Sequence, residues 1–115
     1  MRVYNRKAFM ELPEGTLYLK GVPWAFDGLS LKHDTLRKDN GEAFDWVYTD
    51  LAYIGATDSG ELGSRCDEML EAGASYPLND SAGRDGFFDD EDIMMVYEKD
   101  DLLALRGYID EALKL

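Results

Sequence analysis

Apolar and polar positions alternate along several segments of the chain, a pattern typical of half-buried strands. The run 44–51 places Phe44, Trp46 and Tyr48 on one face, and it is rich in the aromatic and β-branched residues that favour strands. The run 93–97 is apolar on both faces, which indicates a strand in the middle of a sheet. These two segments are the clearest strand predictions in the chain.

Two shorter strands are predicted in the first third of the sequence. Residues 16–20 favour a strand that Gly21 and Pro23 interrupt, and residues 29–32 alternate apolar and polar after the turn dipeptide Asp27-Gly28. The segment 24–26 between them fits a short edge strand. We therefore expect 16–20 and 29–32 to form an antiparallel hairpin, and 34–42 to be a polar loop.

Helical periodicity and capping residues predict three helices. Asn5 has the chemistry of an N-cap for a short helix ending near Glu11. A longer helix is expected from Asp58, with Glu61 at capping-box spacing, to a stop at Gly73. Its apolar face consists of Leu62, Cys66, Met69 and Leu70. A final helix is expected to begin at Asp100 or Asp101, and its apolar face consists of Leu102, Leu105, Ile109, Ala112 and Leu113.

The order of these elements predicts an α+β fold. Without an internal repeat or a linker, we expect residues 1–115 to form a single domain. The expected architecture is a mostly antiparallel sheet of three to five strands packed against two main helices. The connection 74–92 is long for a compact domain, and loops of such length are often functional.

The charge of the chain is strongly asymmetric. Residues 1–45 hold seven basic and seven acidic residues, whereas residues 46–115 hold five basic and seventeen acidic ones, so the net charge of −12 arises in the second part. Such a field repels nucleic acids and anionic membranes and attracts basic protein surfaces. We expect no direct nucleic-acid binding. We also expect no association with membranes, because no apolar run is long enough to span one, and hence a cytoplasmic location.

The acidic loop 85–92 is the most distinctive candidate site. Phe87 and Phe88 would supply apolar anchors within a rim of carboxylates, an arrangement suited to a basic partner. The residues assigned to partner binding are Asp85, Phe87, Phe88, Asp89, Asp90, Glu91 and Asp92. A solvated turn is the alternative. A calcium loop fits poorly, because Ser81 and Gly83 occupy two principal ligand positions.

No catalytic or cofactor motif stands out. His33 precedes Asp34, but adjacent strand residues point in opposite directions and no nucleophile motif accompanies them. Cys66 lies among acidic residues, which disfavours a reactive thiolate. We therefore assign no catalytic residue, no metal site and no cofactor. A small hydrolase that uses aspartates and a divalent metal is retained as the least favoured hypothesis.

Segments 9–20, 68–78 and 83–89 resemble short proteins encoded by tailed phages and prophages. The resemblance carries no established activity, but it implies a context in which small acidic proteins bind and inhibit host machinery, sometimes by imitating the charge of DNA. The leading expectation is thus an accessory protein, acting in the host cytoplasm, that binds a basic or nucleic-acid-binding host protein. The alternative is a structural or housekeeping phage protein that forms homo-oligomers through its tryptophan and tyrosine side chains.

Overall fold

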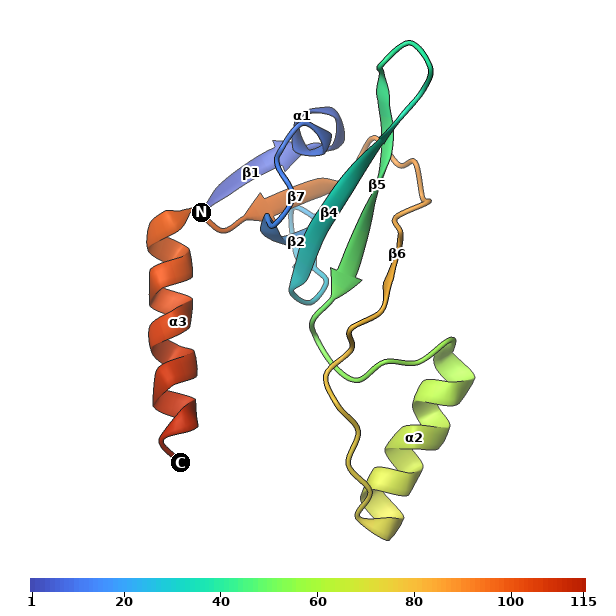
Figure 1. Ribbon diagram of the computed structural model, residues 1–115, viewed down its shortest axis with the longest axis vertical. Coiled ribbons are helices and arrows are strands. Elements are labelled where there is room, and N and C mark those ends of the chain that lie inside the picture. Colours follow the sequence, from blue (N-terminus) through green and yellow to red (C-terminus); the bar gives the residue numbers. More distant parts are fainter.

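Seven antiparallel strands form one sheet in the computed structural model, which describes residues 1–115 (Figure 1). The spatial order is β1-β7-β2-β4-β5-β6, and β3 pairs with β2 at one side of this path. The strands are β1 (Arg2–Asn5), β2 (Leu17–Val22), β3 (Ala25–Phe26), β4 (Ser30–Arg37), β5 (Ala43–Asp50), β6 (Ala82–Arg84) and β7 (Ile93–Val96). The helices are α1 (Arg6–Met10), α2 (Ser59–Ala72) and α3 (Lys99–Leu113).

The α+β class and the mostly antiparallel sheet are confirmed. The predicted hairpin forms between β2 and β4, where Leu17 pairs with Leu31 and Tyr18 with Ser30. The central position predicted for residues 93–97 is also confirmed, because β7 pairs with β1 on one side and with β2 on the other.

The sheet has more strands than the three to five that were predicted. β1 and β6 were missed because they are short and because their pairing depends on backbone groups rather than on a side-chain pattern. β4 extends to Arg37 through residues predicted to be loop, with a register shift between Lys32 and Thr35 that interrupts the alternation of its side chains.

A small aromatic core lies between α1 and the sheet. The buried apolar side chains are Phe9, Met10, Tyr18, Trp46, Met94 and Val96. The Phe9 ring lies 4.5 Å from the Tyr18 ring and 5.1 Å from the Trp46 ring, measured between centroids. Trp46 Nε1 donates a 2.9 Å hydrogen bond to the Tyr18 hydroxyl, so the polar atoms of both rings are paired inside the core.

Polar residues make up half of the twelve buried side chains. They are Arg6, Ser30, Lys32, Asp45, Thr49 and Asp85. Lys32 is an example: burial lowers the pKa of its ammonium group, and Nζ donates to Thr35 Oγ1 at 2.7 Å and to the His33 carbonyl at 3.1 Å. The sheet therefore closes around hydrogen-bonded polar groups as well as around apolar ones.

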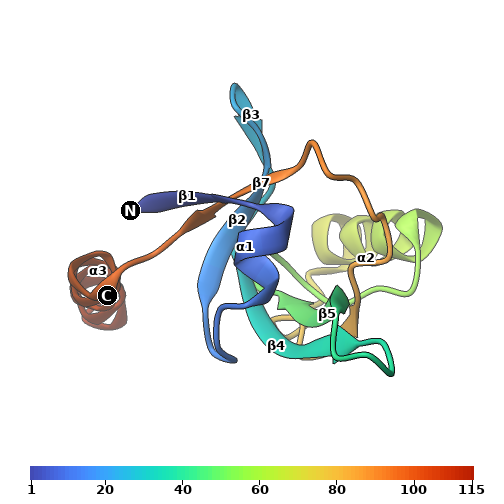
Figure 2. The same ribbon diagram turned by 90° about the horizontal axis from the view of Figure 1, so that it is seen from above.

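The two main helices that were predicted are present as α2 and α3, but they do not pack on the sheet as expected. Neither α2 nor α3 contains a buried residue, and both project from the sheet (Figures 1 and 2). The radius of gyration is 16.1 Å, whereas a compact domain of this length has about 13 Å. None of the helices combines the length and the apolar character that crossing a membrane would require.

The predicted ends of α2 are confirmed, whereas the predicted start of α3 is wrong. Asp58 Oδ1 accepts a 2.8 Å hydrogen bond from the Glu61 N–H, and Gly73 adopts φ 69° at the C-cap of α2, as expected. α3 begins earlier than predicted, with Glu98 as its N-cap. Asp101 lies in its first turn and accepts a 2.8 Å hydrogen bond from the Glu98 N–H.

Candidate functional site

The acidic loop 85–92 divides into an inner and an outer set of side chains. Asp85 and Asp92 point inward and pair with Lys20, whose Nζ lies 2.8 Å and 3.4 Å from their carboxylates. Burial alone would lower the pKa of Lys20, but the hydrogen bond and the charge of Asp85, with those of Asp92, raise it above its ordinary value. These two aspartates are therefore paired within the protein, although the single charge of Lys20 balances only part of their negative charge.

The outer set of the loop consists of Asp89, Asp90 and Glu91, which are exposed, together with the two phenylalanines. Phe87 is 72% exposed and Phe88 52% exposed. Each ring nevertheless covers a cation with one face: Lys20 Nζ lies 4.2 Å from the Phe87 centroid, and Arg6 Cζ lies 5.5 Å from the Phe88 centroid. Phe88 adopts φ 52°, a left-handed conformation that costs energy in a residue with a side chain.

Asp45 anchors the start of this loop from inside the sheet. Its carboxylate is fully buried and accepts hydrogen bonds from Arg84 Nε at 3.0 Å and from the Gly86 N–H at 3.2 Å. Arg6 Nη2 lies 3.9 Å away, and Arg6 Nε is buried without a partner. The sequence provides no sign of this role, because Asp45 is one of several acidic residues within strand-like patterns.

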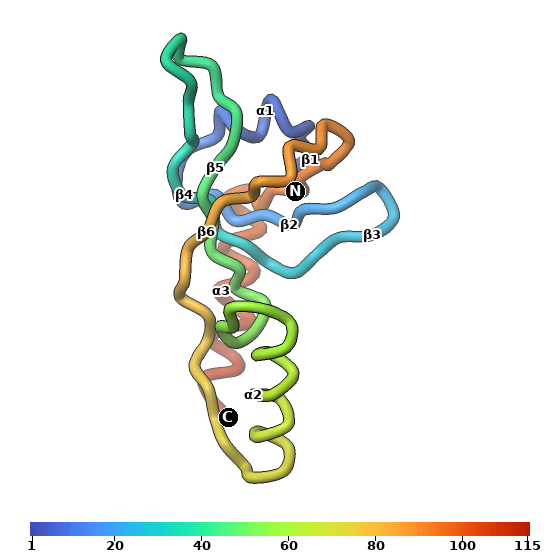
Figure 3. Tube along the Cα trace, turned by 90° about the vertical axis from the view of Figure 1, so that its right-hand side faces the viewer, coloured from blue at the N-terminus to red at the C-terminus, as the bar shows by residue number.

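Two connections run beside each other between the sheet and α2. Residues 51–58 lead into the helix and residues 73–81 return from it (Figure 3). Ile54 forms an antiparallel bridge with Leu78, and the Asn79 N–H donates to the Tyr53 carbonyl at 3.0 Å. Asn79 Nδ2 also donates to the Asp50 carbonyl at 2.9 Å, so this side chain joins the end of β5 to the returning segment.

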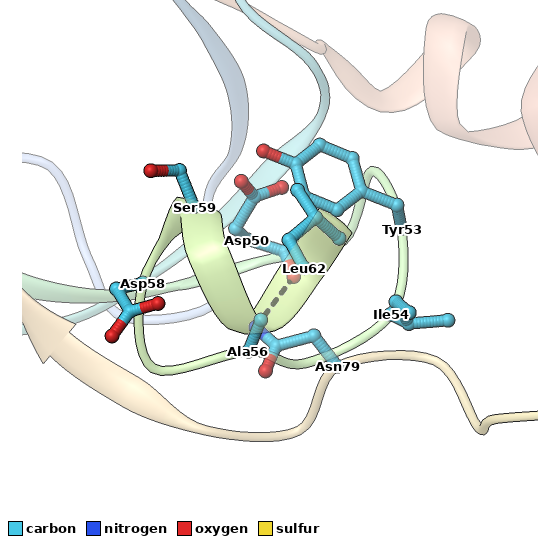
Figure 4. A pocket seen from close by; sticks show the side chains of 8 residues that line it. All are labelled: Asp50, Tyr53, Ile54, Ala56, Asp58, Ser59, Leu62 and Asn79. Atoms are coloured by element: carbon cyan, nitrogen blue, oxygen red, sulfur yellow. Dashed lines mark hydrogen bonds between the residues drawn. The ribbon is translucent and has the colours of Figure 1, made fainter. Parts of the chain in front are cut away.

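Three adjoining cavities form a groove along these connections. The first cavity lies beside Phe87 and has a volume of about 310 Å³. The second lies beside Leu62 and has a volume of about 260 Å³ (Figure 4). The third lies beside Arg65 and has a volume of about 380 Å³. The first and second share Asp50 and Tyr53, and the second and third share Ala56 and Asn79. The groove is lined mainly by residues from 48–65 and 76–87, and its first cavity also by β2 and the start of β4.

We call this feature the acidic groove, because six acidic and two basic residues line it. The acidic residues are Asp27, Asp50, Asp58, Glu61, Asp80 and Asp85, and the basic residues are Lys20 and Arg65. Both basic residues already have acidic partners: Lys20 pairs with Asp85, and Arg65 Nη2 lies 2.9 Å from Glu61. Asp27, Asp50, Asp58 and Asp80 form no ion pair, so the groove keeps a net negative charge.

The negative charge of the groove acts on Tyr48, which lines the first cavity. Burial is the main cause that raises the pKa of its hydroxyl, and the charges of Asp85, Asp50 and Asp27 raise it further. Lys20 acts in the opposite direction but does not cancel them. Three carboxylates therefore act on a single hydroxyl group in the cavity.

The remaining candidates from the sequence are placed elsewhere. His33 Nε2 lies 2.7 Å from Thr49 Oγ1, and Asp34 is exposed, so the two do not form a paired acid and base. Cys66 is exposed on α2 with a free thiol. No group of three or more histidine, cysteine or acidic side chains has a geometry that could hold a metal ion.

Sequence reasoning located the loop but missed the groove. Asp27, Asp50 and Asp80 are separated by more than twenty residues each, and no spacing rule connects them. The chain matches no protein-family profile, no curated protein sequence and no solved structure. A function must therefore be inferred from the arrangement of the side chains themselves.

Proposed function

We propose that the chain is a protein-binding module that holds a basic segment of another protein in the acidic groove, against the outer side of the loop 85–92. The observation that carries the proposal is the charge of the groove. Both of its basic residues are paired internally, whereas Asp27, Asp50, Asp58 and Asp80 have no basic partner. A basic segment would supply the missing positive charge and bury the exposed faces of Phe87 and Tyr53.

A nucleic-acid-binding host protein is the partner class that fits this surface best, because such proteins carry clusters of lysine and arginine for phosphate contacts. The resemblance of segments 9–20, 68–78 and 83–89 to short phage proteins agrees with this choice. In this setting the chain acts as a phage-type accessory protein that competes with DNA or RNA for the basic surface of its target and thereby inhibits it.

The test is a binding titration with a basic probe at low and at physiological salt. The probe is a peptide rich in lysine and arginine, measured by calorimetry. We expect binding that weakens by at least ten-fold as salt rises, because the contacts are between charges near the surface. Removing three charges from the groove, with Asp27→Asn, Asp50→Asn and Asp80→Asn combined, is expected to weaken binding by a further ten-fold or more.

The matched control removes the same number of charges outside the groove, with Asp39→Asn, Asp67→Asn and Asp110→Asn combined. These three residues are exposed on the β4–β5 turn, on α2 and on α3. The control variant is expected to retain most of the affinity. Equal losses in the two triple variants would mean that only the total charge matters, and the groove would then not be the binding site.

Self-association is a second candidate function, and α3 is the observation in its favour. Leu103, Tyr108, Ile109 and Leu113 are between 46% and 78% exposed on this helix. Residues 99–114 carry three basic and four acidic side chains, so two copies of α3 can pair without strong repulsion. Trp46, which the self-association hypothesis would have used, is fully buried, whereas Trp24 is 84% exposed.

Sedimentation of the wild type and of Ile109→Asp tests whether the chain self-associates through α3. A dimer that the substitution converts to a monomer would support it, since a charge in an apolar helix interface is costly. A wild-type chain that sediments as a monomer at all concentrations would exclude it.

A further inference from the structure

The first cavity of the acidic groove has the walls of a cation-binding pocket. Tyr18, Tyr48, Tyr53 and Phe87 supply aromatic rings from β2, β5, the connection after β5 and the loop before β7. Its volume of about 310 Å³ lies at the lower end of the range for ligand sites. The cavity therefore suits a group the size of one side chain rather than a nucleotide or a flavin.

One hydroxyl group that lines this cavity, that of Ser30, has no partner within the chain. Ser30 is only 8% exposed and lines the cavity, but its hydroxyl forms no hydrogen bond within the protein. The Tyr18 hydroxyl, by contrast, is already paired, because it accepts a hydrogen bond from Trp46 Nε1. Buried polar groups are rarely left unpaired. The Ser30 oxygen is open to the cavity, so a polar ligand there would serve as its partner.

The charges around the cavity select a positively charged ligand. Asp27 and Asp50 line it without a basic partner, and Asp85 adds a third carboxylate, which Lys20 only partly balances. The faces of aromatic rings attract cations as well. Phe87 shows this within the chain, because its ring already lies 4.2 Å from Lys20 Nζ.

The arrangement favours an organic cation over a metal ion. A metal requires several oxygen ligands that converge on one point at about 2.0–2.6 Å, and the structure contains no such group of carboxylates. Carboxylates that are spread around aromatic walls match a guanidinium group instead. This group is planar, stacks on rings and directs five N–H donors outward, whereas the ammonium group of lysine is a compact point charge.

We propose that the cavity lined by Tyr48 and Phe87 receives one arginine side chain of the protein partner. The inference deepens the proposed function and rests on it. The guanidinium group stacks on the aromatic walls, donates to the Ser30 hydroxyl and forms ion pairs with Asp27 and Asp50. The remaining part of the basic segment then lies in the second and third cavities.

The experiment uses two peptides of equal length and charge, one with arginine as its only basic residue type and one with lysine. Calorimetry with the full chain at low salt is expected to show about ten-fold tighter binding of the arginine peptide. Phe87→Ala removes a stacking wall, and Ser30→Ala removes the hydroxyl acceptor that lines the cavity. Each is expected to weaken binding of the arginine peptide about five- to ten-fold, with little effect on the lysine peptide.

Matched control substitutions exist for each variant. Phe88→Ala changes the neighbouring ring, which is also exposed but does not line the cavity, and Ser64→Ala changes an exposed serine on α2. Both controls are expected to keep the preference for arginine. Thermal melting of all four variants verifies that they fold.

The outcomes separate this inference from the proposed function. Binding of both peptides with equal affinity, or a preference that Phe87→Ala and Ser30→Ala leave unchanged, would overturn the arginine pocket while the basic-partner proposal stands. Failure of both peptides to bind would overturn both. Loss of the preference in the two pocket variants alone would support the pocket.

Discussion

The sheet and the two long helices of this protein differ in what stabilises them. In the sheet, Trp46 and Asp45 are fully buried, and each has hydrogen-bond partners from other elements. In α2 and α3 no residue is buried, although both helices carry apolar residues on one face. The comparison teaches that an amphipathic pattern specifies a helix but does not specify what its apolar face contacts.

The residues that stabilise the fold also differ from the residues that are proposed to bind a partner. The sheet contains the aromatic core and the internal ion pairs of Asp45 and Lys20. The acidic groove lies where the sheet leads into α2, whereas α3 and its exposed apolar residues follow β7, near the β1 edge of the sheet (Figure 1). Substitutions of buried residues in the sheet should therefore lower the free energy of unfolding, and substitutions of the residues that line the acidic groove should alter binding.

The largest effect is expected for Trp46→Ala. This change removes a fully buried ring and the hydrogen bond to Tyr18, and we expect the free energy of unfolding to fall by about 3–5 kcal/mol. Trp24→Ala is the matched control, because Trp24 is 84% exposed and should change stability by no more than about 0.5 kcal/mol. Urea unfolding measures both, and similar losses in the two variants would contradict the position of the core.

A smaller loss is expected for Asp45→Asn. The amide cannot balance the charges of Arg84 and Arg6, although it keeps the shape of the carboxylate. Since Arg84 is 54% exposed and remains hydrated, we expect a loss of about 2 kcal/mol. Urea unfolding at pH 7 tests this, with Asp67→Asn on the surface of α2 as the control. An unchanged unfolding midpoint would show that the buried ion pair contributes nothing.

The third expectation concerns the stability at alkaline pH. Burial, reinforced by nearby carboxylates, raises the pKa values of Tyr18 and Tyr48 in the folded protein. A group whose pKa is raised by folding stabilises the protein below its unfolded pKa, which is about 10 for tyrosine. This contribution disappears as pH rises through the folded pKa. Stability should thus decline above about pH 10, and less steeply in Tyr48→Phe, which urea unfolding at several pH values would reveal.

The smallest effect is expected when α3 is removed. A chain that ends at Glu98 loses the ion pair between the Met1 ammonium group and Asp101, whose atoms lie 2.9 Å apart. Because both groups are partly exposed and water screens their attraction, the free energy of unfolding should hardly change. Thermal melting of the shortened chain tests this. A collapse of the sheet on truncation would show that α3 contributes to the core.

How far the sequence predicts the site can be judged from particular residues. The cap residues Asn5, Asp58 and Gly73 were identified correctly, because capping depends on neighbours within a few positions. The loop 85–92 was identified from its composition, but its division into inner and outer carboxylates was not. That division arises because Lys20, more than sixty positions away in the chain, lies beneath Asp85.

The sequence by itself determined the local structure: the helix caps, the strong strands 44–51 and 93–97, and the excess of negative charge. These features depend on propensity, on periodicity and on the count of charged residues, all of which are local or additive. Only the tertiary structure decided that α2 and α3 stay off the sheet, that Asp45 is buried and that separate aspartates line one groove. Such features depend on contacts between distant residues, which the pairing of the strands brings together.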